Sequence, residues 1–352
     1  MARWSRGGLL TVSRCPACGG IDRAGEAFRI ADHLGTGLPD IWSIWRCAAC
    51  ASLFLDPRPD DASIPATYAS YYTHDAPGPA QGAGLADRVL WPFFRGYLRK
   101  YFGWESQPAS AAGAWLCVLF PPLRFKLDYL ARQLFVSEFP ERGRLLDIGC
   151  GNGEFLAAAT RMGWRVHGLE PDAEAVAACR GQGFDVFEGT LDAFPPSQEG
   201  SFDAITSSNC IEHVPDPGQF LDKAYSLLKP GGQLWLATPN PEGLGVAVFG
   251  RCWRGLEPSR HLCVPSQAQL GRLLEDAGFD QVRLLRRGAH GKTITRESAQ
   301  VALIESSAGR PIRPGSRWMA LPVRMMASAM GTLSPRQGEE TVITARRPPP
   351  QP

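Results

Sequence analysis

Apolar and polar positions follow two alternating periods through the central part of the chain. Arg144–Ile148 is an apolar run typical of a strand, and from Glu154 onward apolar residues recur at helical spacing. The same alternation continues toward the C-terminus and predicts an α/β fold with a mainly parallel sheet. The expected strands are 144–148, 165–170, 185–190, 201–210, 233–238, 280–287 and 339–345.

A glycine turn joins the first expected strand to its helix. Gly149, Gly151 and Gly153 stand at every second position, and Asp147 lies two residues before the first of them. Glycine allows unusual dihedrals and close approach to a ligand, and the N–H groups that open a helix lack intrahelical partners. The turn therefore predicts a nucleotide-type cofactor loop. Its G-x-G-x-G spacing differs from the G-x-G-x-x-G of dinucleotide-binding enzymes, which argues against NAD.

This stretch resembles motif I of the class I S-adenosylmethionine (SAM) methyltransferases. Glu212–Pro217 (EHVPDP) and Leu228–Gly232 (LKPGG) are similar to other segments of that family. The resemblance covers residues 125–346. It implies a Rossmann-like sheet of seven strands, mostly parallel with an antiparallel last strand, and a ligand beyond the carboxyl ends of the strands.

The resemblance also implies which residues bind SAM. Glu170, which lies 17 residues after Gly153, would accept hydrogen bonds from the ribose hydroxyls. Asp192 would accept a hydrogen bond from the adenine amino group, with Leu191 as its apolar neighbour. Asn209 would contact the methionine part of SAM. The plainer alternatives are a solvated acid for Glu170 and a turn cap for Asp192. The expected cofactor set is Asp147, Gly149, Cys150, Gly151, Gly153, Glu170, Pro171, Leu191, Asp192, Asn209 and Cys210.

Three residues are candidates for the chemistry itself. His213 is the expected general base for a hydroxyl acceptor, and His261 lies where family members often have a histidine on the substrate side. With Glu212 they could bind a divalent ion, as the E-x-x-E-H motif does in ubiquinone-biosynthesis and small-RNA methyltransferases. Asn209 replaces the first acid of that motif, so a catalytic metal is not favoured. Both histidines could instead be satisfied by hydrogen bonds.

Two C-x-x-C pairs near the N-terminus, Cys15–Cys18 and Cys47–Cys50, have 28 residues between them. Four thiolates suit tetrahedral zinc in a closed structural site, so a small zinc-ribbon-like module is expected over residues 1–60. Disulfides or a redox pair are the alternatives. The four expected ligands are Cys15, Cys18, Cys47 and Cys50.

Residues 51–59 and the tyrosines after them resemble a group of bacterial methyltransferases with an N-terminal zinc ribbon. Several members are encoded with sugar or surface-polysaccharide enzymes, and in related sugar C-methyltransferases the module helps to shape the substrate side. A stabilising clip at the chain start is the plainer alternative. The tyrosines are Tyr68, Tyr71 and Tyr72.

Residues 61–124 are expected to connect this module to the catalytic domain. Pro77–Gly84 has the composition of a linker, Leu85–Phe102 is a basic amphipathic helix, and Trp115–Phe120 is an apolar stretch that two prolines end. Such stretches can lie on a membrane, cover an apolar substrate or simply pack on a domain. Three further segments are a helix over 126–139, an insertion over 291–335 and a disordered tail over 347–352.

Composition narrows the function further. The net charge of +2, with 37 Lys and Arg against 35 Asp and Glu residues, predicts no strong field for nucleic acid. The expected location is cytoplasmic, with peripheral membrane contact left open and no indication of oligomeric state. The sequence predicts a SAM-dependent methyltransferase for a small-molecule acceptor, a sugar, lipid-linked or polyketide- or quinone-like hydroxyl or carbon. An RNA methyltransferase and a catalytically silent SAM-fold partner are the alternatives.

Overall fold

The computed structural model describes residues 4, 7–31, 40–68, 85–105, 108–287, 292–307, 309 and 319–350. Several expectations concern residues outside these ranges and therefore stay predictions. They are the linker 77–84, Tyr71, Tyr72 and the last two residues of the tail.

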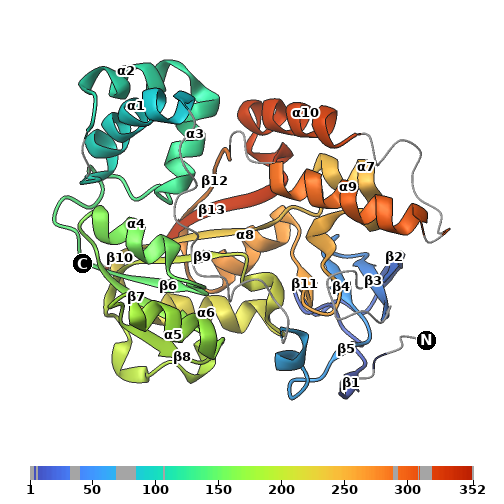
Figure 1. The fold of residues 1–352 in the computed structure, drawn as a ribbon. Coiled ribbons are helices and arrows are strands. Elements are labelled where there is room, and N and C mark those ends of the chain that lie inside the picture. Colours follow the sequence, from blue (N-terminus) through green and yellow to red (C-terminus); the bar gives the residue numbers. More distant parts are fainter. Residues whose placement is uncertain are drawn as a thin grey trace.

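A seven-stranded sheet forms the centre of the molecule (Figure 1). Its order is β12-β13-β10-β9-β6-β7-β8; β10, β9, β6, β7 and β8 are parallel, and β13 is antiparallel to both its neighbours. This confirms the Rossmann-like fold with one antiparallel strand. The bounds are β6 (Arg144–Ile148), β7 (Arg165–Glu170), β8 (Val186–Glu188), β9 (Phe202–Ser208), β10 (Leu228–Pro239), β12 (Asp280–Leu284) and β13 (Glu340–Arg346).

Helices cover both faces of this sheet: α4 (Glu154–Arg161), α5 (Ala173–Gly181), α6 (Pro217–Leu227) and α8 (Gln267–Asp276). Both faces need cover because side chains alternate along each strand. On β6, Leu146 and Ile148 pack in the core with α6 and α8, whereas Leu145 packs with α4 on the other face. Asp216 caps α6 and Ser266 caps α8 through their side-chain oxygens.

The helix that leads into the sheet differs from its expected range. It is α3 (Pro121–Leu130), not residues 126–139. Proline is tolerated in a first turn, so Pro121 and Pro122 separate α3 from the helix before it and then begin α3. Arg132 and Gln133 have positive φ angles of 47° and 50°, which takes the backbone out of the helix after residue 131.

Two strands also differ from expectation. β10 begins at Leu228, so the LKPGG segment belongs to the strand, with a shift in register against β9 between Leu228 and Gln233. Gly231 takes a φ of 80° there, which glycine allows without strain. β12 ends at Leu284, three residues short of its expected end.

A second sheet is antiparallel, with the order β11-β4-β3-β2. Its outer strand β11 lies beyond β10 in the chain, so the N-terminal module and the catalytic part share one sheet. They also share a core, in which Trp42 and Leu55 pack with Phe249 and Trp253. The bounds are β2 (Arg23–Ala31), β3 (Ile41–Cys47), β4 (Leu53–Leu55) and β11 (Cys263–Val264), and a short pair joins β1 (Leu9–Leu10) to β5 (Arg58–Pro59).

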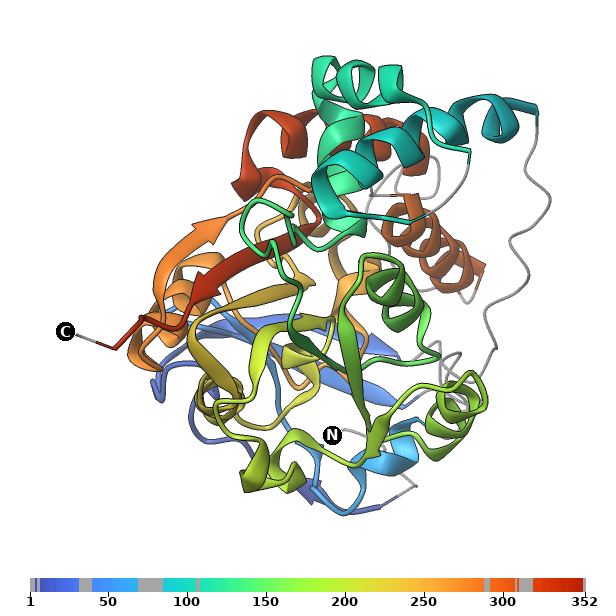
Figure 2. The same cartoon turned by 90° about the vertical axis from the view of Figure 1, so that its left-hand side faces the viewer.

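The remaining helices are α1 (Leu85–Phe102), α2 (Ala111–Leu119), α7 (Leu244–Phe249), α9 (Lys292–Ser307) and α10 (Ala320–Leu333). The predicted insertion thus forms α9 and α10, which contact each other and α7. Figures 1 and 2 show α1, α2 and α10 together along one side of the molecule. Within the described ranges, none of the helices combines the length and apolarity that a bilayer crossing requires.

Candidate functional site

The glycine loop follows β6, from which the sheet continues to β7 and β8 on one side and to β9 and β10 on the other. Ligands of open α/β sheets bind in the crevice at such a switch point. Gly149, Gly151 and Gly153 have positive φ angles of 71°, 51° and 84°. A Cβ on Gly149 would lie 2.1 Å from Cys210 Sγ, whereas a Cβ on Gly151 would meet no atom within 4 Å. Gly149 is therefore required by packing, and Gly151 borders open space.

Glu170 ends β7 and points at this loop. Its Oε2 accepts a hydrogen bond from the Gly151 N–H at 2.9 Å, and its Oε1 accepts one from the Asp172 N–H at 3.1 Å. The side chain is only 7% exposed, and this burial raises its pKa above the usual range. Each carboxylate oxygen keeps a second lone pair that can accept a hydrogen bond from a ligand.

Asp147 lies beneath the loop and does not border it directly. Its side chain is only 1% exposed. The Arg132 guanidinium donates to its Oδ1, and the Thr206 hydroxyl donates to the same oxygen at 2.8 Å. Burial raises the pKa of Asp147, and the positive charge of Arg132 opposes that rise. Arg132 also stacks on the Phe155 ring, 3.6 Å from its centroid. Sequence reasoning missed Arg132, because only the turn after α3 brings it here.

The other expected cofactor residues are spread around the same edge. Asp192 and Asn209 are exposed, and Asn209 has a φ of 54° at the end of β9. Leu191 is buried in the main core. The side chain of Cys150 packs between α4 and α5, so only its backbone can face a ligand. Cys210 Sγ lies 3.3 Å from the Ile148 carbonyl oxygen, and Pro171 is exposed after β7.

Residues 123–284 match the family model of a methyltransferase domain. That match covers β6 to β12 and includes the glycine loop, Glu170 and the end of β9. The chain carries a class I SAM-dependent methyltransferase domain. Its sheet order and its single antiparallel strand agree with the fold expected for that family.

The methyltransferase domain also has curated relatives. Over 133 residues the chain is 35% identical to the ubiquinone biosynthesis O-methyltransferase of Xanthomonas axonopodis pv. citri (strain 306), which covers 36% of this chain and 54% of the relative. The protein of that name from Xanthomonas euvesicatoria pv. vesicatoria (strain 85-10) is 34% identical over the same shares. The chain thus spans about half the length of these relatives. A SAM-dependent methyltransferase structure from Archaeoglobus fulgidus aligns over 64% of this chain and 94% of that chain, at 20% identity and a TM-score of 0.42.

Glu212, His213 and His261 converge just beyond the end of β9. One ligand atom of each lies within 4.8 Å of the others, and the two imidazole centroids are 4.7 Å apart. Sequence spacing places Glu212 and His213 together in the 3-10 helix η5 (Ile211–His213). His261 arrives from the segment before β11, where the Leu262 N–H donates to the Glu212 carbonyl at 2.7 Å.

The protonation of this group follows from its burial. Glu212 is fully buried, which raises its pKa to about 8, and its Oε2 accepts a hydrogen bond from the Thr238 hydroxyl at 2.8 Å. Among the described residues its Oε1 has no hydrogen-bond partner. Burial and the neighbouring His213 lower the pKa of His261 to about 3. His261 Nδ1 lies 2.8 Å from the Gly255 carbonyl, so that nitrogen carries the proton.

Tyr68 reaches His213 from the N-terminal module. Its hydroxyl oxygen lies 2.9 Å from His213 Nδ1, and the Arg260 carbonyl lies 3.2 Å from the same nitrogen. Both oxygens can accept a hydrogen bond, which favours the tautomer with its proton on Nδ1 and a free lone pair on Nε2. Burial lowers the pKa of His213, so the ring is neutral. Tyr68 entered the sequence analysis only through the family resemblance, and its contact with His213 was not predicted.

A buried ion network supports this segment. Glu257 accepts from the Arg260 Nε at 2.8 Å and from the Arg254 guanidinium, and its Oε2 lies 3.4 Å from His261 Nε2. Burial alone would raise the pKa of Glu257, but the positive charges of Arg254 and Arg260, with His261, hold it well below its usual range. Arg260 also donates to the Thr67 carbonyl at 3.1 Å, next to Tyr68.

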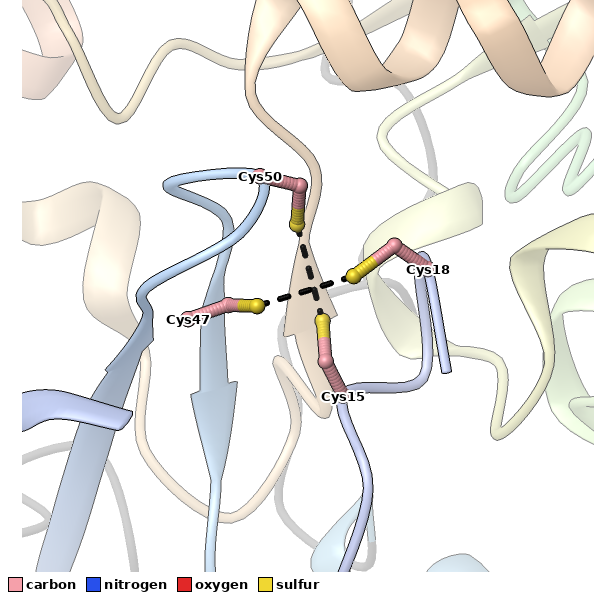
Figure 3. A group of neighbouring side chains, drawn as sticks. All are labelled: Cys15, Cys18, Cys47 and Cys50. Atoms are coloured by element: carbon pink, nitrogen blue, oxygen red, sulfur yellow. Dashed lines mark hydrogen bonds between the residues drawn. The ribbon is translucent and has the colours of Figure 1, made fainter. Parts of the chain in front are cut away.

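The four cysteines of the two knuckles point toward one another (Figure 3). The Cys15 and Cys50 sulfurs are 3.7 Å apart, and the Cys18 and Cys47 sulfurs are 3.5 Å apart. A disulfide requires about 2 Å, so the disulfide alternative is wrong for this structure, in which all four cysteines are free thiols. Zinc–sulfur bonds of about 2.3 Å in a tetrahedron place the sulfurs about 3.8 Å apart, which fits the cluster.

Proposed function

We propose that this protein transfers the methyl group of SAM to a hydroxyl of a small-molecule acceptor, with His213 as the general base. One observation carries the proposal: a neutral histidine with an available Nε2 lies just past the strand end that borders the glycine loop. A base in this place suits a hydroxyl better than an amine or a thiol, because the hydroxyl must lose its proton as it attacks. The names of the curated relatives, ubiquinone biosynthesis O-methyltransferases, support the same class of acceptor.

In this proposal SAM lies over the glycine loop. Gly151 borders open space, and the Glu170 carboxylate beside it would accept hydrogen bonds from the ribose hydroxyls. Asp192 and Asn209 are exposed on the flanking strand ends, where they would meet the adenine and the methionine part. Arg132 would keep its ion pair with the buried Asp147 beneath the loop.

The chemical step needs few groups. The acceptor oxygen attacks the methyl carbon as the bond from that carbon to the sulfonium sulfur breaks, and His213 Nε2 takes the hydroxyl proton. S-adenosylhomocysteine and the methyl ether are the products. Because the positive sulfonium is lost, exclusion of water and alignment contribute much of the rate. The hydrogen bonds of His213 to Tyr68 and to the Arg260 carbonyl fix the orientation of its ring.

The same residues also form a donor set for a divalent ion. One buried carboxylate oxygen without a described partner and two neutral imidazoles fit a transition metal or Mg²⁺ with open positions. Such an ion would lower the pKa of the bound hydroxyl and orient it toward the methyl group. Asn209 stands where the related motif has a further acid, so the ion would have three protein ligands here. Added divalent ions therefore separate the two modes, provided that the structural zinc is left in place: the activity of the base-only enzyme does not depend on them, and that of the metal enzyme requires them.

For the four-cysteine cluster we propose a closed structural zinc site. Four sulfurs leave no open position for a substrate or water, so the ion would support the fold and not the reaction. The cluster is placed to hold the start of α8, since the Ser266 hydroxyl donates to the Cys50 carbonyl at 2.7 Å and Gln269 donates to the Ala17 carbonyl at 2.8 Å.

Thermal shift and activity measurements test the function. We expect S-adenosylhomocysteine to raise the melting temperature, and catechol- or sugar-type hydroxyl acceptors to be methylated from SAM. His213→Gln should reduce kcat by about 10²- to 10⁴-fold while leaving S-adenosylhomocysteine binding intact. His167→Gln, within β7 and three residues before its end at Glu170, is the control and should keep full activity. No stabilisation by S-adenosylhomocysteine would identify the silent partner instead, and full activity of His213→Gln would exclude the base.

A further inference from the structure

The helix α2 has an inverted pattern of burial. In α2 the buried residues are Gly113, Ala114 and Cys117, whereas the large apolar residues face outward. A helix that packs on a soluble protein normally buries its large apolar side chains and exposes polar ones. The outward residues of α2 and its C-cap are Trp115, Leu116, Leu119 and Phe120, which are 67%, 53%, 79% and 59% exposed.

Small residues on the inner side explain how this arrangement packs. A Cβ on Gly113 would lie 2.1 Å from the Phe93 carbonyl oxygen, and one on Gly96 would lie 1.8 Å from the Ser110 carbonyl oxygen. The backbones of α1 and α2 are therefore in direct contact, and no space remains between them for large side chains. Those side chains point away from the fold as a consequence.

A second apolar stripe lies on α10. The helix α10 contacts α3, which follows α2 directly. A shallow apolar hollow between α3 and α10 is lined by Pro122, Ser328, Ala329, Thr332 and Leu333. The exposed side chains of α10 include Leu321, Met325, Met326 and Leu333, which are 54%, 65%, 47% and 76% exposed. We call the outer surface of α1, α2 and α10 the helical face (Figures 1 and 2).

Basic residues outnumber acidic residues in the segments that form the helical face. Residues 85–127 and 306–338, which contain these helices, hold eleven of the 37 Lys and Arg residues and two of the 35 Asp and Glu residues. The rest of the chain therefore carries 26 basic and 33 acidic residues. Lys100 lies 4.3 Å from the Trp115 ring centroid and Arg95 lies 5.8 Å from the Trp91 ring centroid, so cations border the apolar side chains.

We propose that the helical face docks on the surface of a bilayer that contains anionic phospholipid. Trp115, Leu119 and Phe120 would enter the boundary between headgroups and acyl chains, while Arg99 and Lys100, both exposed, would contact lipid phosphates. RNA would suit the basic residues but not four large apolar side chains on a helix without a charge. The helical face lies mostly outside the residues that match the family model, so it is a feature of this chain. It also does not depend on methyl transfer.

Cosedimentation of the full chain with vesicles, without SAM or acceptor, tests the proposal. We expect binding to vesicles of phosphatidylcholine with phosphatidylglycerol, weak binding to phosphatidylcholine alone, and a loss of binding as salt increases. Leu119→Asp should weaken binding by about tenfold or more, because it places a charge among the inserted side chains. Lys100→Glu should weaken binding to anionic vesicles alone, again by about tenfold. Ile21→Asp replaces an exposed apolar residue of the N-terminal module, and this variant should bind as the unchanged protein does.

Several results would overturn the proposal. These are no binding to any vesicle, equal binding by Leu119→Asp, or binding of a structured RNA without vesicle binding. A dimer in sedimentation velocity that Leu119→Asp dissociates, with no vesicle binding, would instead assign the helical face to a second copy of the chain. All variants change exposed residues, and unchanged melting temperatures would show that they fold.

Discussion

At the scale of single residues, the structure separates groups that face the cofactor crevice from groups that hold it. Glu170 faces the glycine loop with both carboxylate oxygens bonded to backbone N–H groups. Asp147, only two residues before the first glycine, is buried against Arg132 and Thr206. Asp147 precedes the glycine loop in sequence and Glu170 follows it, and of the two acids only Glu170 bonds to the backbone of the loop.

Glu170→Gln tests the role of that acid. The amide nitrogen of glutamine would face an N–H donor of Gly151 or Asp172, and the charge-assisted bonds to the ribose would be lost. We expect the dissociation constant for S-adenosylhomocysteine to rise by about 10- to 100-fold in isothermal titration calorimetry. Glu275→Gln, exposed on α8, is the matched control. An unchanged affinity for Glu170→Gln would place the cofactor elsewhere.

The raised pKa of Glu212 predicts how the stability of the protein depends on pH. Its pKa is about 8 in the folded protein and close to 4.5 when unfolded, so folding favours the protonated form. The stability from this group is fully present below pH 4.5 and is lost as pH rises through about 8. We therefore expect Glu212→Gln to gain stability over the unchanged protein, by on the order of a few kcal/mol, between about pH 5 and pH 8. Urea unfolding at both pH values measures this gain.

The same measurement separates the two modes of catalysis. A divalent ion on Glu212 would favour its ionised form, so adding the ion should remove the pH dependence in the unchanged protein but not in Glu212→Gln. If the ion has no effect on the unchanged protein, His213 acts without a metal. A difference between the two proteins that shrinks with rising pH would contradict the buried, protonated Glu212.

At the scale of elements, β4 and β11 connect the cysteine cluster to the candidate catalytic site. Cys263 pairs with Phe54, and the Leu55 N–H donates to the Leu262 carbonyl at 3.0 Å. His261 precedes this pairing by two residues. Tyr68 approaches His213 from the same module. The module thus supplies one side of the site through short backbone and side-chain contacts.

Removal of one zinc ligand should therefore affect both stability and the site. We expect Cys47→Ser to lose bound zinc in elemental analysis and to lower the melting temperature by several degrees or more, since structural zinc contributes directly to folding. Cys252→Ser, equally buried but outside the cluster, should keep its zinc. A zinc-free protein that melts at an unchanged temperature would show that the cluster is not a metal site.

At the scale of the whole molecule, the described residues form one body in which the N-terminal module completes the catalytic part. Trp42, Leu53 and Leu55 share a core with Phe249 and Trp253 of the segment after β10 and with the insertion helix α9. The segment between β10 and α8 would lose its cover without the module. The helical face lies on another part of this body, formed by the connector and the insertion (Figure 1).

Removal of residues 1–68 tests this shared core. The deletion would expose Phe249, Trp253 and Leu262, and burial of such side chains contributes about 1.5–3 kcal/mol each. We expect the shortened chain to aggregate, or to unfold without a cooperative transition in circular dichroism. A soluble shortened chain that melts cooperatively and binds S-adenosylhomocysteine would show two independent units.

The sequence by itself predicted the seven strands, their mostly parallel arrangement and the glycine loop, whereas the order of the strands in the sheet came from the structure. The strand–helix alternation, the glycines after Asp147 and the capping residues Asp216 and Ser266 are local signals, and local backbone preferences and side-chain periodicity decide them. The two cysteine pairs also predicted the four-cysteine cluster, because four thiolates at that spacing are typical of few kinds of site.

Only the tertiary structure decided which distant residues meet. Arg132 reaches Asp147 because the backbone leaves α3 with two positive φ angles, and Tyr68 reaches His213 across 145 positions of sequence. The meeting of His261 with Glu212 depends on the pairing of β11 with β4, and the outward side chains of α2 depend on the glycine contact with α1. Such contacts form when the whole chain packs, and no short-range pattern records them.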